Sequence, residues 1–349
     1  MKKYRKIARF LLLALFVAVM LYITMKDDAA DIVTILKNLN LRHTIFLIFA
    51  SLLTYVIAGI TLTKLTKRVN PSYPMHSGIS NALVSLFLMN VTASAVAKAG
   101  QMLMFKMKKV DLDQSCSILV VDQIMYQISY IALCLTVFFL NITFFQTSLP
   151  NEVPFAIFGL LISFVPIIAI AMIFLWPSLQ RRFTHWITNL AHKIKPSFDV
   201  DGFEQKVDAF INSLHEANTL YAGDWKLLFG IHLWNTLRLV LRHSLPLFVA
   251  IALHIEVSVY EIPLFFGASI FVDLVLSALP VYGKHGVAES TFVLVFTVLT
   301  GKASAASIML IWRAITFYTN TIIGGLVMMI SPDISMENLR KVKEEQRTT

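Results

Sequence analysis

The chain has 349 residues, of which 57% are hydrophobic and 15% are charged, and its mean hydropathy is +0.70. Soluble domains average about 45–50% apolar and about 25% charged residues, so this composition excludes an ordinary soluble domain and indicates an integral membrane protein. The formal net charge of +9 does not indicate nucleic-acid binding, because the basic residues flank hydrophobic spans, where they set topology and contact anionic lipid.

The first predicted transmembrane helix covers residues 8–25 and follows a basic N-terminus. In charge and hydrophobicity this segment resembles a signal sequence. The charged Lys26, Asp27 and Asp28 that follow offer no small-residue cleavage site, which favours an uncleaved span. The basic residues before it place the N-terminus in the cytoplasm.

Five further spans reach the roughly 20 apolar residues that a bilayer crossing needs. They are predicted at 43–63, 117–140, 154–177, 227–253 and 305–330. Two more apolar regions, 79–109 and 262–300, are interrupted by small and polar residues. These two interrupted regions decide the topology.

The region 79–109 lies between two clusters of basic residues that both favour the cytoplasm. Both clusters lie inside only if the region enters and leaves the membrane on one face. We therefore predict a re-entrant hairpin, opened by small and polar residues. The first basic cluster is Lys64, Lys67 and Arg68, the second is Lys98, Lys106, Lys108 and Lys109, and the opening residues are Asn90, Thr92, Ser94 and Gly100.

The region 262–300 is predicted to be the opposite hairpin, entering from the outer face. Acidic Glu256 and Glu261 precede it, and the basic tail after the last span returns to the cytoplasm. Ser94 precedes Gly100 by six residues, and Pro280 precedes Gly286 by six. Opposed hairpins with this shared spacing indicate an inverted repeat, in which transporters place substrate at the midplane.

The predicted fold is therefore an all-α polytopic membrane protein with about six full transmembrane helices and two opposed re-entrant hairpins. Residues 1–177 form the first membrane half, and 227–331 form the second. Residues 178–226 are expected to form a cytoplasmic linker of two amphipathic helices on the membrane surface. Residues 332–349 form a cytoplasmic tail.

The break in the second hairpin carries three ionisable residues between apolar runs, where such groups are costly and mark functional sites. Lys284 and His285 lie in the break, where exposed backbone and a helix terminus attract phosphate; the alternative is a lysine that merely reaches water. Glu289 either caps the following helix, or faces a cationic headgroup, or carries a coupling proton.

A second group of charges is expected on the 227–253 span. His232, Asn235, Arg238 and Arg242 recur at helical spacing, and two arginines one turn apart repel each other. They therefore need anions. Either Asp122 and Asp273 supply structural ion pairs, or a lipid phosphate binds the guanidinium groups. Asp273 is also expected to pair with Arg313.

No metal, cofactor or catalytic residue is predicted. Cys116 and Cys134 lie in or beside apolar runs, and nine histidines are scattered without the pairing of a zinc site. No glycine-rich phosphate loop followed by Lys-Ser or Lys-Thr occurs.

Leu279-Pro280, Gly283 and Gly286-Val287-Ala288-Glu289, followed by Arg313, resemble the flippase-like transmembrane domain of the lysylphosphatidylglycerol synthase family. Over nearly the whole chain the resemblance continues. In the first hairpin Asn90 and Gly100 match the family pattern. Ser94, Gln101 and Met104 stand where Pro, Glu and Arg are usual.

The resemblance implies translocation of an aminoacylated phospholipid, such as lysylphosphatidylglycerol, or of another lipid-linked headgroup between the leaflets of a bacterial inner membrane. Full-length members carry a soluble aminoacyl-transferase domain after the membrane half, whereas this sequence ends in a short charged tail. A membrane phospholipid is then the substrate, and a separate synthase or glycosyltransferase is a partner. Two alternatives stay open: a phosphatidylglycerol lysyltransferase that uses lysyl-tRNA, and a membrane scaffold for a separate synthase or glycosyltransferase.

The charges and the resemblance together predict that the second hairpin recognises the headgroup and that the first supplies the matching wall. The expected headgroup-binding or translocation residues are Asn90, Gly100, Gln101, Asp122, Arg238, Arg242, Asp273, Pro280, Gly283, Lys284, His285, Gly286, Glu289 and Arg313.

Overall fold

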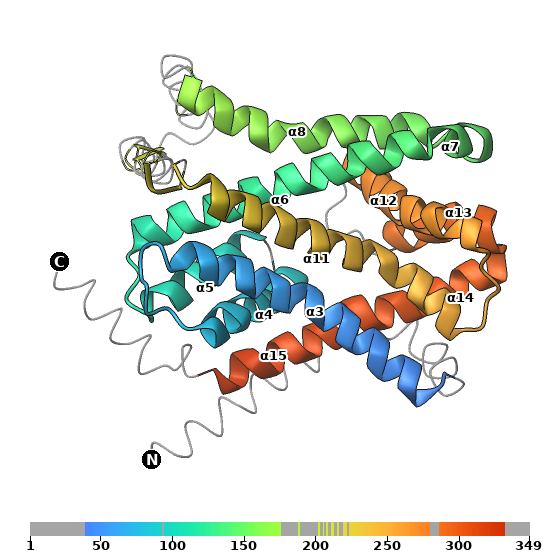
Figure 1. Ribbon diagram of the computed structural model, residues 1–349, viewed down its shortest axis with the longest axis horizontal. Helices are drawn as coiled ribbons and strands as arrows, with labels where there is room; N and C mark the ends of the chain where they lie inside the picture. Colours follow the sequence, from blue (N-terminus) through green and yellow to red (C-terminus); the bar gives the residue numbers. More distant parts are fainter. Residues whose placement is uncertain are drawn as a thin grey trace.

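A computed structural model describes residues 39–92, 94–175, 223–279 and 286–331, together with a few single residues between 188 and 221. The described chain is helical and contains no strand. The predicted first span, most of the 178–226 linker and the tail 332–349 lie outside these residues. The described helices (Figure 1) are α3 (Leu41–Thr66), α4 (Met75–Val91), α5 (Ser94–Lys106), α6 (Leu112–Leu140), α7 (Ile142–Ser148), α8 (Val153–Leu175), α11 (Trp225–Ala252), η1 (Val259–Glu261), α12 (Ile262–Ala278), α13 (Val287–Thr300), α14 (Lys302–Arg313), η2 (Ala314–Thr319) and α15 (Asn320–Ile330).

Four described stretches are long and apolar enough to cross a membrane, judged by length and composition. They are α3, α6, the run Val259–Ala278 formed by η1 and α12, and the run Lys302–Ile330 formed by α14, η2 and α15. Shorter apolar segments lie in α8 and α13. The helix α11 adds 28 residues and carries Arg238 and Arg242 near its middle. The prediction of an all-α polytopic membrane protein is confirmed.

Polar residues determine where three of the long helices begin, because the first backbone N–H groups of a helix lack internal partners. The Asn40 side chain accepts a hydrogen bond from the Arg42 N–H at 3.0 Å and starts α3. Asp111 and Gln114 form a capping box at the start of α6. Asp224 accepts from the Leu227 N–H at 3.1 Å and starts α11. Each cap sets the register of the apolar run that follows.

The two membrane halves repeat the same order of helix lengths. In the first, α3, α4, α5 and α6 have 26, 17, 13 and 29 residues. In the second, α11, α12 and α13 have 28, 17 and 14 residues, and the run from α14 to α15 has 29. A long, short, short, long pattern repeated in this way is what an internal structural repeat predicts.

The first hairpin consists of α4 and α5, and both of its ends lie at the same end of the bundle. Before it, the Asn70 side-chain amide donates to the Lys108 carbonyl oxygen, which follows it, at 3.0 Å. The rings of Tyr73 and Phe105 have centroids 5.8 Å apart. A helix of 13 residues spans about 20 Å, less than the roughly 30 Å of a bilayer core. The two ends of this segment therefore lie together, and α5 by itself is shorter than a full crossing.

The second hairpin consists of α12 and α13 and lies toward the other end of the bundle. Figure 1 shows α4 and α5 at its left end and α12 and α13 toward its right end. The Phe265 ring, near the start of α12, lies 5.7 Å from the Phe296 ring near the end of α13. The two helices are therefore antiparallel, and the break between them, with Pro280 to His285, lies outside the described residues.

The two ends of the bundle differ in charge. We call the end that contains Lys67, Arg68 and Lys109 the basic end. There, Arg68 forms an ion pair with Asp224 and joins the end of α3 to the start of α11. At the opposite end the rings of His43 and His254 lie 5.9 Å apart, next to the start of α3 and the end of α11. These contacts make α3 and α11 an antiparallel pair.

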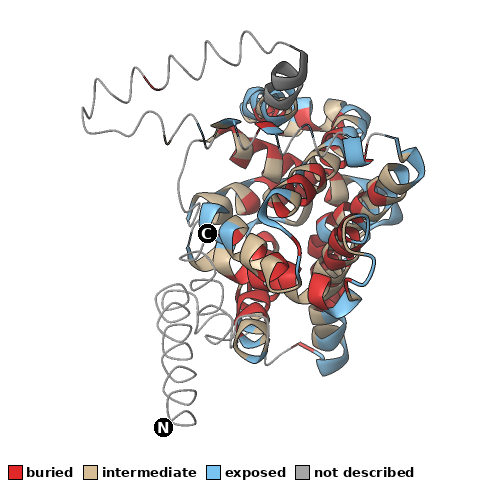
Figure 2. Ribbon diagram, turned by 90° about the vertical axis from the view of Figure 1, so that its left-hand side faces the viewer, coloured by how far each residue is buried: buried red, intermediate tan, exposed pale blue. Residues whose placement is uncertain are grey.

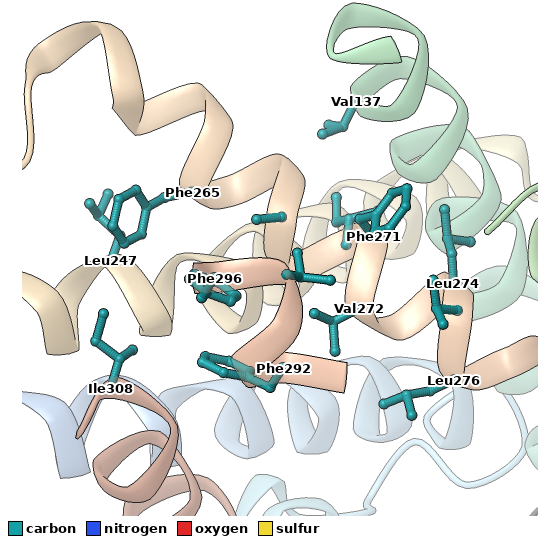
Figure 3. Close-up of a cluster of buried hydrophobic side chains, with 14 of the residues drawn as sticks. Val137, Leu247, Phe265, Phe271, Val272, Leu274, Leu276, Phe292, Phe296 and Ile308 are labelled. Carbon is teal, nitrogen blue, oxygen red and sulfur yellow. The ribbon is translucent and has the colours of Figure 1, made fainter. Parts of the chain in front are cut away.

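The largest apolar core surrounds the second hairpin. Figure 3 shows side chains of α6, α11, α12, α13 and α14 meeting there, including Leu247, Phe271, Phe292 and Phe296. The rings of Phe292 and Phe296 stack at 4.2 Å. Buried residues line the inward faces of the helices, and exposed ones lie on their outer faces (Figure 2). Many of the exposed side chains are large and apolar, as lipid contact requires.

Candidate functional site

Arg242 and Asp273 form an ion pair between α11 and α12. The guanidinium Nη2 lies 3.2 Å from Asp273 Oδ2, and the two side chains are 48% and 24% exposed. Arg242 lies about 15 Å from the end of α11 at Ala252, at the rise of a regular helix. A charged, half-exposed arginine this far from a helix end needs water or a polar ligand beside it wherever the helix lies in a bilayer.

His243 lies next to Arg242 and is 2% exposed, and it is not among the residues predicted from the sequence. Its Nδ1 lies 3.1 Å from Ser269 Oγ, and its Nε2 lies 3.9 Å from Asp273 Oδ2. A small cavity of about 10 Å³ lies beside these groups and is also lined by Phe292 and Trp312. That volume is enough for about one water molecule.

Glu289 and Arg313 form a second ion pair, between the first turn of α13 and the last turn of α14. The side chains are 15% and 9% exposed. The expected pair of Asp273 with Arg313 is wrong. Because α13 packs against both α12 and α14, Glu289 lies against Arg313, whereas Asp273 contacts Arg242 on α11.

The ion pair also decides how the Glu289 carboxylate is used. One carboxylate oxygen contacts Arg313, and the other, Oε2, is buried without a hydrogen-bond partner among the described residues. Pairing, rather than capping, therefore occupies this side chain, although its first-turn position also suits the helix dipole. The guanidinium lies 5.5 Å from the Phe317 ring centroid and 5.8 Å from that of Tyr318.

Asp122 and Arg238 lie in a third charged group, between α6, α11 and the first hairpin. Asp122 accepts a hydrogen bond from Thr61 Oγ1 at 3.4 Å. The cations that act on it are Lys98, the stronger, and Arg238. The Arg238 guanidinium lies 5.0 Å from the Tyr126 ring centroid. Lys98, which the sequence analysis used only for topology, therefore belongs to the site.

The four residues predicted to share one face of α11 have different surroundings in the structure. Arg238 and Arg242 are partly exposed, whereas Asn235 is completely buried. His232 contacts Ser129 on α6, with 2.8 Å between its Nδ1 and the serine Oγ. The two arginines therefore form the part of this face that a ligand reaches.

Polar side chains of α3 and α15 extend the arginine pair across the bundle. Tyr55 lies near Asn320, and the charges of Arg242 and Arg238 act on it. Asn320 also donates to Ser51 Oγ at 2.8 Å. The π-helical segment η2 directly precedes Asn320, and such segments often occur at functional sites. We call Tyr55, Arg238, Arg242, Asp273 and Asn320 the polar layer.

The first-hairpin residues make structural contacts. Asn90 donates to Thr321 Oγ1 at 2.8 Å and joins the hairpin to α15. A Cβ at Gly100 would lie 2.5 Å from Leu88 Cδ1, so the absent side chain lets α4 and α5 approach. Gln101 is 6% exposed, and its backbone carbonyl accepts from the Asn81 amide at 3.3 Å.

The structure thus brings Arg242 and Asp273 together, pairs Glu289 with Arg313, and places Asp122 near Arg238. Gly286 has a φ of +83° and precedes α13 directly, a backbone conformation that suits glycine. Pro280, Gly283, Lys284 and His285 lie outside the described residues. Among the described residues no group of three or more His, Cys, Asp or Glu side chains has the arrangement of a metal site.

Comparison with known families gives one match to report. The family model described as the lysylphosphatidylglycerol synthase TM region matches residues 7–324. A comparison with curated proteins finds no match. The matched residues include both hairpins and the polar layer, and the family supports a role connected with membrane lipid. The chain therefore belongs to the family of the lysylphosphatidylglycerol synthase transmembrane region.

Proposed function

We propose that this protein translocates a phosphate-bearing lipid headgroup, either that of an aminoacylated phospholipid such as lysylphosphatidylglycerol or another lipid-linked headgroup, between leaflets. The observation that carries the proposal is Arg242, which is half exposed and lies ten residues from the end of α11. Among the described side chains it is hydrogen-bonded to Asp273, whereas a guanidinium has five N–H donors. Phosphate takes two such donors at once.

The surroundings of Arg242 support a path along which a lipid headgroup moves, rather than a closed binding site. Arg238 is one turn away on the same helix, and the Tyr55 side chain lies within electrostatic reach of both arginines. Opposed short hairpins pack at the two ends of the bundle, as in transporters that bind substrate at the midplane. The headgroup would contact the polar layer while its acyl chains stay in lipid, with the basic end facing the cytoplasm.

The two carboxylates of the second hairpin suit the cationic part of an aminoacylated headgroup. Asp273 is 24% exposed beside Arg242, so a lysyl ammonium bound there would compete with the guanidinium. Glu289 is held by Arg313 and is less exposed. Asp273 is therefore the first contact, and Glu289 stabilises the hairpin that positions it.

Reconstitution of the full chain into vesicles with fluorescent lipids tests the proposal. Arg242→Ala should reduce translocation of phosphatidylglycerol and lysylphosphatidylglycerol by about tenfold or more, the effect of one lost charge-assisted contact. Arg68→Ala is a matched control. It breaks another Arg–Asp pair, 47% and 24% exposed, that lies at the basic end rather than in the polar layer. An absence of protein-dependent movement for phosphatidylglycerol, lysylphosphatidylglycerol and isoprenoid phosphate lipids would refute the proposal.

A further inference from the structure

His243 combines almost complete burial with an unsatisfied ring nitrogen. Its Nδ1 is engaged by Ser269 Oγ at 3.1 Å. Its Nε2 has no hydrogen-bond partner among the described residues, although Asp273 Oδ2 lies 3.9 Å away. The same carboxylate oxygen receives Arg242 at 3.2 Å. One carboxylate thus lies between a permanent cation and a group that can become one.

One tautomer of the neutral ring accounts for this geometry. When Nδ1 carries the single proton of the neutral ring and donates it to Ser269, Nε2 is an acceptor. An acceptor that faces a carboxylate forms no hydrogen bond, and the 3.9 Å separation follows. A proton added at Nε2 converts it to a donor aimed at Asp273, and the adjoining cavity of about 10 Å³ has room for the water that delivers it.

Few titratable or charged groups face His243 from the helices around it. The charges that act on it belong to Asp273 on α12 and Arg242 on α11. From α13 and α14, Phe292 and Trp312 line the cavity, and neither titrates. Farther away, Tyr55 on α3 and Tyr126 and Tyr130 on α6 interact with Arg242, and Tyr130 and Cys134 interact with Asp273.

We propose that His243 is a proton-binding site that controls Arg242. Protonation of Nε2 gives Asp273 a second cationic partner, which weakens its hold on Arg242 and lets the half-exposed guanidinium bind a lipid phosphate. No covalent bond changes, and the proton comes from water. Because linkage is reciprocal, phosphate binding then takes up a proton. This inference rests on the proposed headgroup site and adds that acid strengthens it.

Binding of short-chain phosphatidylglycerol to the detergent-solubilised protein, measured by calorimetry, tests this control. The wild type should bind about tenfold more tightly at about pH 4 than at about pH 7, a typical size for coupling between two sites. His243→Gln should show less than about a twofold difference. The control is His232→Gln, which removes a histidine of the same helix whose Nδ1 also contacts a serine, Ser129, at 2.8 Å. It should keep the full difference.

A pH dependence that persists in His243→Gln, or that is absent from the wild type, would overturn the inference. Ser269→Ala is a second test for the case in which His243→Gln fails to fold, since it keeps the histidine and removes only the Nδ1 partner. It should shift the pH at which binding changes, whereas a purely packing role for His243 predicts no shift.

A lipid-free measurement separates this inference from the proposed function. In protein labelled with ¹⁵N-histidine, the signals that disappear in His243→Gln belong to His243, and they should move to imidazolium positions between about pH 7 and about pH 4. If they stay neutral, the inference fails whatever the vesicles show. If they titrate and lipid binding follows the pH while no lipid crosses the vesicles, translocation fails and the proton site stands.

Discussion

Glu289 and Arg313 join the first turn of α13 to the last turn of α14 through an ion pair with mostly buried side chains. After the break in the second hairpin, the described residues begin again at Gly286, three positions before Glu289. The ion pair therefore holds the returning arm of the hairpin against the final membrane run. Its loss should affect the hairpin more than any exposed pair does.

Arg313→Ala should lower the free energy of unfolding by about 3–5 kcal/mol, because it leaves the Glu289 carboxylate buried without its cation. The double variant Glu289→Gln, Arg313→Met removes both charges and should recover much of that loss. Arg68→Ala, in an exposed pair with Asp224, should cost less than about 1 kcal/mol. Unfolding in mixed micelles measures all three. Equal losses for Arg313→Ala and Arg68→Ala would show that the α13–α14 pair contributes no more than a surface contact.

The general architecture followed from properties that are local in the sequence. Apolar run length predicted α3, α6 and the final run to Ile330. Basic residues such as Lys67 and Lys109 predicted that the two ends of the segment between them lie together, as the hydrogen bond from Asn70 to Lys108 shows. Helix breaks at small and polar residues placed both hairpins. These sequence patterns predict helices and helix breaks because each depends on a few neighbouring residues and on the bilayer, not on tertiary packing.

The pairing of charged residues could not be predicted from the sequence, because it depends on how the helices are rotated and offset against each other. Asp273 was expected opposite Arg313 and instead contacts Arg242, while Arg313 contacts Glu289. His243 was missed because a single histidine within an apolar run has no sequence signal that separates a packing role from a functional one. Its neighbours Ser269 and Asp273 are 26 and 30 positions away in the chain.

Gly159 allows α8 to contact the backbone of α12. A Cβ at this position would overlap the Leu274 carbonyl oxygen, and backbone cannot move aside as a flexible side chain can. Gly159→Ala should therefore lower the free energy of unfolding by about 1–3 kcal/mol. Gly230→Ala is the control, because a Cβ on this α11 glycine meets no atom within 4 Å. It should be neutral or stabilising by up to about 1 kcal/mol through helix propensity. Unfolding in mixed micelles also compares these two variants, and a harmless Gly159→Ala would contradict the close packing of α8 on α12.

The hydrogen bond from Asn90 to Thr321 connects the first hairpin to α15 at 2.8 Å. A double-mutant cycle with Asn90→Ala and Thr321→Val should give a coupling energy of about 0.6 kcal/mol, the average for interhelical hydrogen bonds in a membrane protein. A coupling near zero would show that the bond does not form in the bilayer. In the vesicle assay, Asn90→Ala should retain more translocation than Arg242→Ala, because Asn90 is bonded to protein and Arg242 is exposed to ligand.

Two residues at the basic end test whether the first hairpin is re-entrant. Lys67 and Lys109 are exposed and flank the hairpin, and the Asn70 to Lys108 hydrogen bond places their loops together. In a background with Cys116 and Cys134 replaced by alanine, Lys67→Cys and Lys109→Cys should react with a membrane-impermeant maleimide from the same side. Glu256→Cys and Lys302→Cys, which flank the second hairpin and are also exposed, should react from the other side. A segment that crossed the bilayer completely between Lys67 and Lys109 would put these two labels on opposite sides, since an odd number of crossings exchanges the faces. Labelling of both from one side, with Glu256→Cys protected from that reagent, excludes a single crossing between them, and the 13 residues of α5, about 20 Å long, are too short for the second of two full crossings.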